Sequence, residues 1–363
     1  MKVGEWILEL DPASKPQTIV VELGTLCNLA CRHCFLNTLR EPRGYMDRKT
    51  FARIVDEIRR LGIRRVVFTG FGEPTIHPDF LDFLKTLKEI GVEIVINTNG
   101  HTLRDYAKHF VDLGIDEIAV SIDSFDNDRY REIRGSDLGN VLEGLDLVNK
   151  LRRERGAKNP TISVYMVLTK KNLVDLDAIP SFVSRYLISK VVVTNIVPLS
   201  EEMEREFACY IDPECIETVE RARDELSRVF FSSYTSIEIA STRPRIERRC
   251  PYIHNQALFV RWDGGVAPCM FFAHRLRICL KSVERNVNPV ILGSIDEGLS
   301  KLWRSRSWIE LRFRVFFNHL PSCLDCDLAP YCEPTQSNDY DCWGNSPTCA
   351  FCPYLHRLAV CPI

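Results

Sequence analysis

The stretch that decides the fold is QTIVVELGTLCNLACRHCFLNT, residues 17–38. It begins with a β-branched run that is typical of a buried strand and passes directly into a loop with three cysteines. Cys27, Cys31 and Cys34 are separated by three and then two residues. With 15 cysteines in 363 residues, the chance of finding this triplet somewhere in the chain is about 0.02. The spacing is therefore a specific signal for chemistry that needs three thiolates on one loop.

The chain beyond this loop repeats one pattern, a Val- and Ile-rich run followed by an amphipathic helix. Apolar residues at helical spacing predict a first helix between the N-cap Asp47 and the C-cap Gly62. The runs RRVVFTG, VEIVINTNG, EIAVSID, TISVYMVL and KVVVTNIVPL extend the series to six strands. Apolar strands that alternate with helices predict a parallel sheet buried on both faces. The expected fold class is α/β, a partial (β/α)6 TIM-like barrel with its site at the carboxyl ends of the strands.

Polar and glycine residues follow three successive strands at the expected mouth of this barrel. The segments are TGFGEP, NTNG and SIDS, which begin at residues 69, 97 and 121. Each alone is typical of an ordinary turn, but their coincidence at successive strand ends favours a binding site. Gly70 and Gly72 would let the backbone approach a ligand, and Glu73 can accept hydrogen bonds from a ligand ammonium group.

Composition and charge narrow the setting. The net charge is −2 with 26% charged residues and no long block of one sign, so the basic footprint of a nucleic-acid-binding protein is missing. No apolar run is long enough for a signal peptide or a membrane span. We therefore expect a soluble cytoplasmic protein with neither nucleic acid nor membrane as a partner. In such a reducing compartment, clustered cysteines are available to a metal.

Three thiolates without a fourth favour an iron–sulfur cluster over zinc. Structural zinc sites take four ligands in two pairs, and His33 cannot easily supply the fourth from inside the triplet. A four-iron cluster has four metal corners, so three cysteines leave one iron open. An open iron can bind a substrate, which makes the missing ligand the reactive position.

The triplet after the first strand of such a barrel resembles the hallmark of the radical S-adenosylmethionine (SAM) enzymes. Over residues 17–200 the resemblance implies that Cys27, Cys31 and Cys34 hold a 4Fe-4S cluster whose open iron binds SAM. It implies an oxygen-sensitive enzyme that cleaves SAM reductively to a 5′-deoxyadenosyl radical, with no catalytic side chain assigned beyond the cluster. The residues that it places against SAM are Gly70, Phe71, Gly72, Glu73, Asn99, Ser121, Asp123 and Arg134.

Two features of this motif set leave room for another interpretation. Phe71 separates two glycines that are adjacent in the common form of the motif. For Asn99, Ser121, Asp123 and Arg134, each taken alone, a structural role is about as well supported as contact with SAM, with Asp123 as a cap and Arg134 as a solvated side chain.

The C-terminal third carries a second cysteine pattern. Cys250, Gly264 and Cys269 surround a run that predicts a hairpin turning at WDGG, and CLDCDLAPYC follows later. The pattern resembles the SPASM extension of radical SAM enzymes, a cysteine-rich α+β domain that usually holds two auxiliary four-iron clusters. This implies one cluster at the first pair of cysteines and one at the later run. The candidate ligands are Cys250, Cys269, Cys323, Cys326, Cys332, Cys342, Cys349, Cys352 and Cys361.

These candidates exceed the eight ligands that two closed clusters need, and the sequence does not identify the spare one. The family pattern expects a cysteine where this chain has Gln336. A zinc ribbon is the alternative, built from the CxxC pairs that begin at Cys323 and Cys349. The cysteines outside the pattern are expected to be structural thiols; they are Cys209, Cys215 and Cys279.

The expected organisation has four parts. They are an N-terminal extension at residues 1–16, a radical SAM barrel core at 17–200, a bridging helical segment at 201–245 and a SPASM domain at 246–363. In the bridging segment, Asp212 followed by proline predicts a helix start. The expected apolar face of that helix is Ile216, Val219, Ala222, Leu226 and Phe230.

The two resemblances together imply a maturase that abstracts hydrogen from a protein, a peptide or a protein-bound cofactor, with a reduced ferredoxin or flavodoxin as electron donor. The closing segment DCWGNSPTCAFCPYLHRLAVCP is similar to that of maturases associated with tungsten-containing oxidoreductases, which implies work on a tungstopterin cofactor or its enzyme. A leader-dependent peptide maturase would need a separate partner, because only 26 residues precede Cys27. The alternatives are a peptide- or haem-modifying SPASM enzyme and a non-enzymatic electron-transfer protein, although an electron carrier would normally close its clusters with four protein ligands.

Overall fold

The computed structural model describes residues 2–3, 6–7, 11, 13–228 and 234–363. A ten-stranded sheet runs through it in the order β14-β11-β10-β3-β4-β5-β6-β7-β8-β9. Six of these strands are the predicted series, all parallel and in chain order. They are β3 (Thr18–Val21), β4 (Arg65–Phe68), β5 (Glu93–Thr98), β6 (Glu117–Ser121), β7 (Thr161–Leu168) and β8 (Lys190–Asn195).

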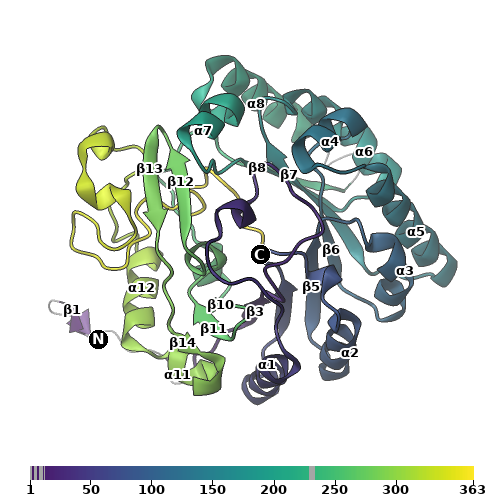
Figure 1. Cartoon of the computed structure of the whole chain (residues 1–363), viewed down its shortest axis with the longest axis horizontal. Coiled ribbons are helices and arrows are strands. Elements are labelled where there is room, and N and C mark those ends of the chain that lie inside the picture. The colour runs from purple at the N-terminus through teal and green to yellow at the C-terminus, as the bar shows by residue number, and fades with distance from the viewer. Residues whose placement is uncertain (1, 4–5, 8–10, 12, 229–233) are drawn as a thin grey trace.

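Helices cover the outer side of this curved sheet, which gives the expected partial barrel (Figure 1). The first helix has the predicted caps: the side chain of Asp47 accepts a hydrogen bond from the Thr50 backbone at 2.6 Å, and Gly62 is left-handed with φ of 60°. The helices between the strands are α1 (Arg48–Leu61), α2 (Phe80–Ile90), α3 (Leu103–Asp112), α4 (Asn127–Arg134), α5 (Gly139–Arg155) and α6 (Ile179–Tyr186).

The strands bury both of their faces, as their continuous apolar sequences predict. On β4, Val66 and Phe68 pack in the core between the sheet and the helices, whereas Val67 packs in a second core together with Val20 and Val95. Successive side chains of a strand point to opposite faces, so a strand that is apolar throughout needs a core on each side. The second core lies on the concave side, where the C-terminal third of the chain supplies its other half.

The sheet continues beyond the six predicted strands at both edges. β9 (Ser236–Ile239) pairs in parallel with β8, and β10 (Ala257–Val260) pairs in parallel with β3. β10 and β11 (Gly265–Ala267) form the predicted hairpin, and β14 (Gly293–Ser294) adds the last strand. An uncovered β3 would expose a row of unpaired backbone groups, which β10 satisfies. The cysteine-rich region is thus joined to the barrel by main-chain hydrogen bonds.

The segment at 201–245 contains a strand as well as the expected helices, α7 (Glu201–Phe207) and α8 (Pro213–Leu226). The side chain of Asp212 caps α8 as predicted by accepting a hydrogen bond from the Cys215 backbone at 3.1 Å. Val219, Ala222 and Leu226 are buried in that helix, whereas the expected apolar residue Phe230 lies outside the described residues.

One expectation about cysteines in this segment was wrong. Cys209 and Cys215 form a disulfide rather than two free thiols. The turn η4 (Cys209–Ile211) leads directly into α8 and leaves the two Cα atoms 5.2 Å apart, within the usual range for a disulfide. Cys279 is a free, buried thiol, as expected.

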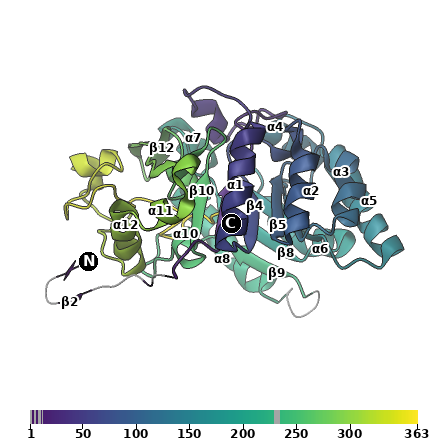
Figure 2. The same ribbon diagram turned by 90° about the horizontal axis from the view of Figure 1, so that it is seen from below.

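The C-terminal third lies beside the barrel (Figure 2), and the end of the chain reaches the middle of the curved sheet (Figure 1). No helix in the described ranges is long and apolar enough to span a membrane. The remaining helices and strands are β1 (Lys2–Val3), β2 (Trp6–Ile7), α10 (Pro251–His254), β12 (Leu276–Leu280), β13 (Val283–Val287), α11 (Leu299–Trp303) and α12 (Arg306–Phe316). The remaining 3-10 turns are η1 (Phe35–Thr38), η2 (Pro74–Ile76), η3 (Leu173–Ala178), η5 (Met270–Phe272), η6 (Ile295–Glu297), η7 (Ala329–Tyr331) and η8 (Glu333–Gln336).

Candidate functional site

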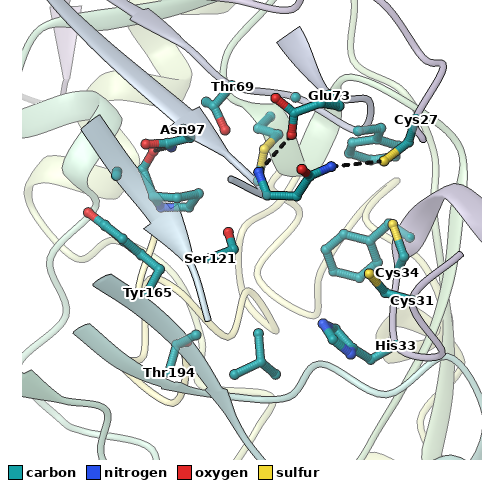
Figure 3. Close-up of a pocket in the computed structure, with 18 of the residues that line it drawn as sticks. Cys27, Cys31, His33, Cys34, Thr69, Glu73, Asn97, Ser121, Tyr165 and Thr194 are labelled. Atoms are coloured by element: carbon teal, nitrogen blue, oxygen red, sulfur yellow. Dashed lines mark hydrogen bonds between the residues drawn. The ribbon is translucent and has the colours of Figure 1, made fainter. Parts of the chain in front are cut away.

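The three cysteines of the first loop line one pocket at the carboxyl ends of the barrel strands. In Figure 3, these cysteines and His33 lie across the pocket from Tyr165, on β7. The loop is held by the rest of the fold: the Arg32 backbone donates to Ile133 at 3.1 Å, and the backbone of Glu73 donates to Leu26 at 2.9 Å. The loop that follows β3 is therefore tied to the connections that follow β4 and β6.

The thiols of this loop are poorly solvated. Burial raises the pKa of all three, and that of Cys31 reaches about 12, although Arg134 acts in the opposite direction. Thiols in such a place become thiolates when a metal supplies the compensating positive charge. Cys27 already accepts hydrogen bonds on sulfur from the Leu29 backbone at 3.4 Å and from the Asn99 amide at 3.7 Å. Sulfur ligands with donors directed at them fit an iron–sulfur cluster.

The two glycines of the GFGEP segment line the pocket and also pack closely against neighbouring parts of the chain. A Cβ on Gly70 would lie 2.6 Å from Cγ of Glu22, and a Cβ on Gly72 would lie 2.4 Å from the carbonyl oxygen of Gly24. Glu22 directly follows β3, and Gly24 lies at the start of the cysteine loop. The glycines are needed because this segment packs directly against the start of the cysteine loop, which brings Glu73 beside the thiols.

Glu73 joins two strand ends inside the pocket wall. Its Oε1 accepts hydrogen bonds from the Thr75 backbone, the Thr75 hydroxyl and the Thr98 hydroxyl at 3.2, 2.6 and 2.7 Å. Its Oε2 accepts one, from the Asn99 backbone at 2.7 Å, and so keeps a lone pair for a ligand amino group. Burial raises the pKa of this carboxyl, while the hydrogen bonds oppose the rise.

Arg134 and Asp123 form a buried ion pair at the opposite wall. Nε of Arg134 lies 2.7 Å from Oδ2 of Asp123, and the backbone of Val167 donates to Oδ1 at 2.7 Å. The pKa of Asp123 is lowered: burial acts to raise it, but the charges of Arg134 and His33 outweigh burial. Asp123 does not cap α4 and Arg134 is not solvated, so these two particular roles are wrong. Arg134 lines the pocket, and Asp123 holds it from behind.

The remaining candidates divide in the same way. Asn99 and Ser121 line the pocket, and the side-chain amide of Asn99 also donates to Asn28 at 2.7 Å. Phe71 lines it as well, with its ring 5.8 Å from that of Phe35, which follows the third cysteine. Of the predicted SAM-contacting residues, only Asp123 lies behind the pocket wall rather than on it.

The sequence interpretation missed the part of the pocket that the end of the chain builds. The Asn97 amide donates to the carbonyl of Pro362 at 2.8 Å, and the backbone of Val360 donates to the Thr194 hydroxyl at 2.8 Å. Tyr354 lines the same pocket. Asn97 belongs to the NTNG segment and was open to prediction, but nothing in the sequence pairs it with a residue 265 positions away.

The nine later cysteines fall into two groups. The inner group surrounds Cys269, where burial raises the thiol pKa and the neighbouring thiols of Cys250 and Cys352 raise it further. The same neighbours act on Cys349 and on Cys361. The outer group surrounds Cys323, whose pKa rises to about 12 through burial and then through Cys342, with Cys326 a smaller cause. Two successive turns join Cys332 to Cys326: the Ala329 backbone donates to Cys326 at 3.0 Å, and the Cys332 backbone donates to Ala329 at 3.3 Å.

The two CxxC pairs of the zinc-ribbon alternative fall in different groups, although the Cys323 backbone donates to the carbonyl of Ala350, inside the second pair, at 3.0 Å. Beside the inner group, the hydroxyl of Tyr252 is buried without a hydrogen-bond partner among the described residues. The thiols of Cys361, Cys269 and Cys250 act on its charge, so it lies near them. An unpartnered donor beside these three thiols fits a sulfur-containing cluster that accepts its hydrogen bond.

The barrel and its thiol-lined mouth define the class, an iron–sulfur barrel enzyme with an open cluster position. Residues 21–183 match the Radical SAM superfamily, and residues 250–327 match the iron-sulfur cluster-binding domain SPASM. The chain is 31% identical, over 95% of its length and 97% of the relative's, to the tungsten-containing aldehyde ferredoxin oxidoreductase cofactor-modifying protein of Pyrococcus furiosus. It therefore belongs to the radical SAM superfamily and carries a SPASM domain.

Another relative matches a smaller share of the chain. A probable GTP 3′,8-cyclase of Pyrococcus horikoshii is 33% identical over 39% of this chain and 46% of its own. Among solved structures, Streptococcus suis SuiB bound to S-adenosylmethionine covers 88% of this chain and 73% of its own, with a TM-score of 0.64 and 17% identity. Native anSMEcpe with bound AdoMet and a Cp18Cys peptide covers 88% of each chain with a TM-score of 0.61 and 17% identity. These two likenesses establish the fold.

The family assignment confirms the predicted fold class, the enzyme class and the cofactors, SAM and iron–sulfur clusters. The chain is a radical SAM/SPASM maturase.

Proposed function

We propose that this maturase modifies the tungstopterin cofactor of an oxidoreductase, or the protein that carries it. The similarity to the Pyrococcus furiosus cofactor-modifying protein supports this role, because it spans 95% of the chain and includes the cysteine-rich third. The observation that carries the chemistry is the pocket in which Cys27, Cys31, Cys34 and Glu73 meet. The electron donor in this proposal is a reduced ferredoxin or flavodoxin, and the compartment is the cytoplasm.

Different residues of the pocket hold the cluster, the amino group of SAM and its carboxylate. Cys27, Cys31 and Cys34 hold the cluster, which when bound supplies the electron that cleaves SAM to the hydrogen-abstracting 5′-deoxyadenosyl radical. Oε2 of Glu73 accepts from the amino group of SAM, because that oxygen keeps hydrogen-bonding capacity. Arg134 faces the SAM carboxylate as a cation that Asp123 keeps in place.

The pocket also limits what can reach the radical. Tyr354, Val360 and Pro362 line its inner side, and the hydrogen bonds to Asn97 and Thr194 keep them there. A wall of ordered chain excludes water from the reacting atoms. A substrate then has to enter past the carboxyl ends of the strands, where Ser121 and Tyr165 offer hydroxyl groups.

The auxiliary clusters are assigned in this proposal by the two thiol groups. Cys323, Cys326, Cys332 and Cys342 supply four ligands for the outer cluster. The inner group has one cysteine more than a closed cluster needs, so the spare thiol belongs to it. Cys349 and Cys361 compete for the fourth position, because the thiols of Cys250, Cys269 and Cys352 raise the pKa of each of them.

The test uses protein purified and reconstituted without oxygen. Wild type is expected to hold about twelve irons, and a Cys27, Cys31, Cys34 to Ala variant about eight, with loss of 5′-deoxyadenosine formation from SAM and dithionite. Cys279→Ala is the matched control, since Cys279 is a buried free thiol whose Sγ donates to Glu204 and which is not among the candidate cluster ligands.

The substrate is tested by adding oxidoreductase that carries its tungstopterin. Turnover should then rise above the basal rate, with a mass change in the pterin or in its protein. A fully loaded wild type that forms no 5′-deoxyadenosine would contradict the enzymatic proposal. One that forms it without any response to the tungstopterin protein would contradict only the substrate.

A further inference from the structure

A fully buried carboxylate lies under the proposed SAM-binding loop, residues 70–73. Glu22 follows β3 and is 1% exposed, and its Oε1 accepts a hydrogen bond from the backbone N–H of Phe71 at 3.0 Å. The absent side chain of Gly70 lets the loop rest on Glu22, because a Cβ there would lie 2.6 Å from Cγ. The loop conformation thus depends on a buried negative charge, which is costly without a positive partner.

The positive partner comes from the SPASM side of the chain. His274 is fully buried, with Nε2 2.8 Å from Oε2 of Glu22 and Nδ1 3.0 Å from Oε2 of Glu41. Because both ring nitrogens face carboxylate oxygens, both have to donate, and only the imidazolium has two N–H groups. Burial by itself lowers the pKa of His274, but the hydrogen bond and charge of Glu22, joined by Glu41, raise it above the ordinary value.

The other charges around this pair are also accounted for. Arg261, which follows β10, binds Glu41 at 3.0 Å and Asp263 at 2.8 Å. Its charge opposes protonation of His274, and Asp263 offsets part of that charge. The imidazole ring also lies against Phe71, with ring centroids 4.7 Å apart. His274 therefore contacts the loop both through Glu22 and directly.

His274 stands five residues after the inner-group Cys269, and Met270 between them lines the SAM pocket. We propose that His274 is a positioning residue that, as an imidazolium, holds Glu22 and thereby the loop at 70–73 in the conformation that binds SAM. Loss of its proton releases the loop, so SAM binding weakens as the pH rises. This inference rests on the proposed function, in which that loop holds SAM.

The test measures SAM affinity against pH in anaerobically reconstituted protein. Equilibrium dialysis gives the dissociation constant, and the SAM-induced change in the electron paramagnetic resonance spectrum of the reduced cluster gives a second readout. In wild type the affinity should fall about tenfold through one titration, the worth of a hydrogen bond to a charged group. His274→Gln should bind SAM about tenfold more weakly at low pH, with no such step.

A second variant keeps the inference falsifiable if His274→Gln fails to fold. In Glu22→Gln, the amide oxygen still accepts from Phe71, and the amide nitrogen donates to a neutral imidazole. Removing one carboxylate lowers the pKa of His274, and the neutral ring keeps its partner, so the step in SAM affinity seen in wild type should disappear. His319→Gln, at an exposed position that does not line the pocket, should reproduce the wild-type profile.

The outcomes separate this inference from the proposed function. Wild-type protein that binds SAM, with an unchanged pH step in both His274→Gln and Glu22→Gln, would overturn the role of His274 and leave the function intact. Wild-type protein that loads its clusters but binds no SAM would overturn both.

Discussion

Asp123→Asn offers a sharp test of how the pocket holds its cation. The carboxylate of Asp123 has no exposed surface, and Arg134 beside it is 6% exposed. The asparagine oxygen can keep the hydrogen bond from the Val167 backbone, so the change removes charge with little change in shape. What it leaves is a buried guanidinium with its nearest counter-charge removed.

The expected loss of unfolding free energy is large because the ion pair is buried away from water. Removing one partner of a buried ion pair costs about 3 to 5 kcal/mol of unfolding free energy, since the remaining charge stays desolvated. Nε of Arg134 lies 2.7 Å from Oδ2 of Asp123, and Nε2 of His33 lies 3.5 Å from the same oxygen. The exposed pair of Asp128 and Arg131, at 3.6 Å, is the matched control, and Asp128→Asn should change stability little.

Denaturant unfolding, carried out without oxygen on protein loaded to equal iron content, compares the two variants with wild type. The pH dependence gives a second check. Because Arg134 and His33 lower the pKa of Asp123, its contribution is complete above its unfolded value of about 4 and is lost as the pH falls through the lowered folded value. The difference between wild type and Asp123→Asn should shrink below that value. Equal stability of Asp123→Asn and Asp128→Asn near neutral pH would refute the reasoning.

Two further changes probe the clusters and the loops. Tyr252→Phe removes the buried, unpartnered hydroxyl beside the inner cysteine group. The reduction potential of one auxiliary cluster should become about 50 mV more negative, the equivalent of about 1 kcal/mol for one electron. Unchanged potentials in redox titrations would argue against the hydrogen bond. Gly72→Ala puts a Cβ 2.4 Å from the carbonyl of Gly24, so the loop at 70–73 should move away from the cysteine loop and SAM binding should be lost. Gly139→Ala is the control: the atom nearest to its Cβ is the end of the Asp137 side chain, and this variant should bind SAM as wild type does.

The barrel was predictable because its signals are local. Asp47 caps α1 by accepting from the backbone three residues further on, and Gly62 ends that helix in the left-handed conformation, so both features are encoded by neighbouring residues. The two-residue period of a strand explains why Val66 and Val67 serve different cores. The spacing of the cysteine triplet works in the same way, because one loop after one strand brings all three thiols to one pocket.

Some features of the site could not be found by such reasoning. Gly70 and Gly72 were assigned to ligand approach and do line the pocket, but the sequence did not show that each also packs against a neighbouring part of the chain. Their local sequence says that a side chain is excluded, but only the packed neighbours say what excludes it. The disulfide between Cys209 and Cys215 likewise depended on how a short turn meets the next helix.

By itself, the sequence determined the parallel barrel, the thiol triplet at its mouth and the class of chemistry, because each is encoded within a few neighbouring residues. Tertiary structure decided how the nine later cysteines divide into two groups and how the end of the chain enters the pocket. It also decided that His274 reaches Glu22 across 252 positions of sequence. Those contacts depend on the path that the whole chain takes around two cores, and no local period or spacing records that path.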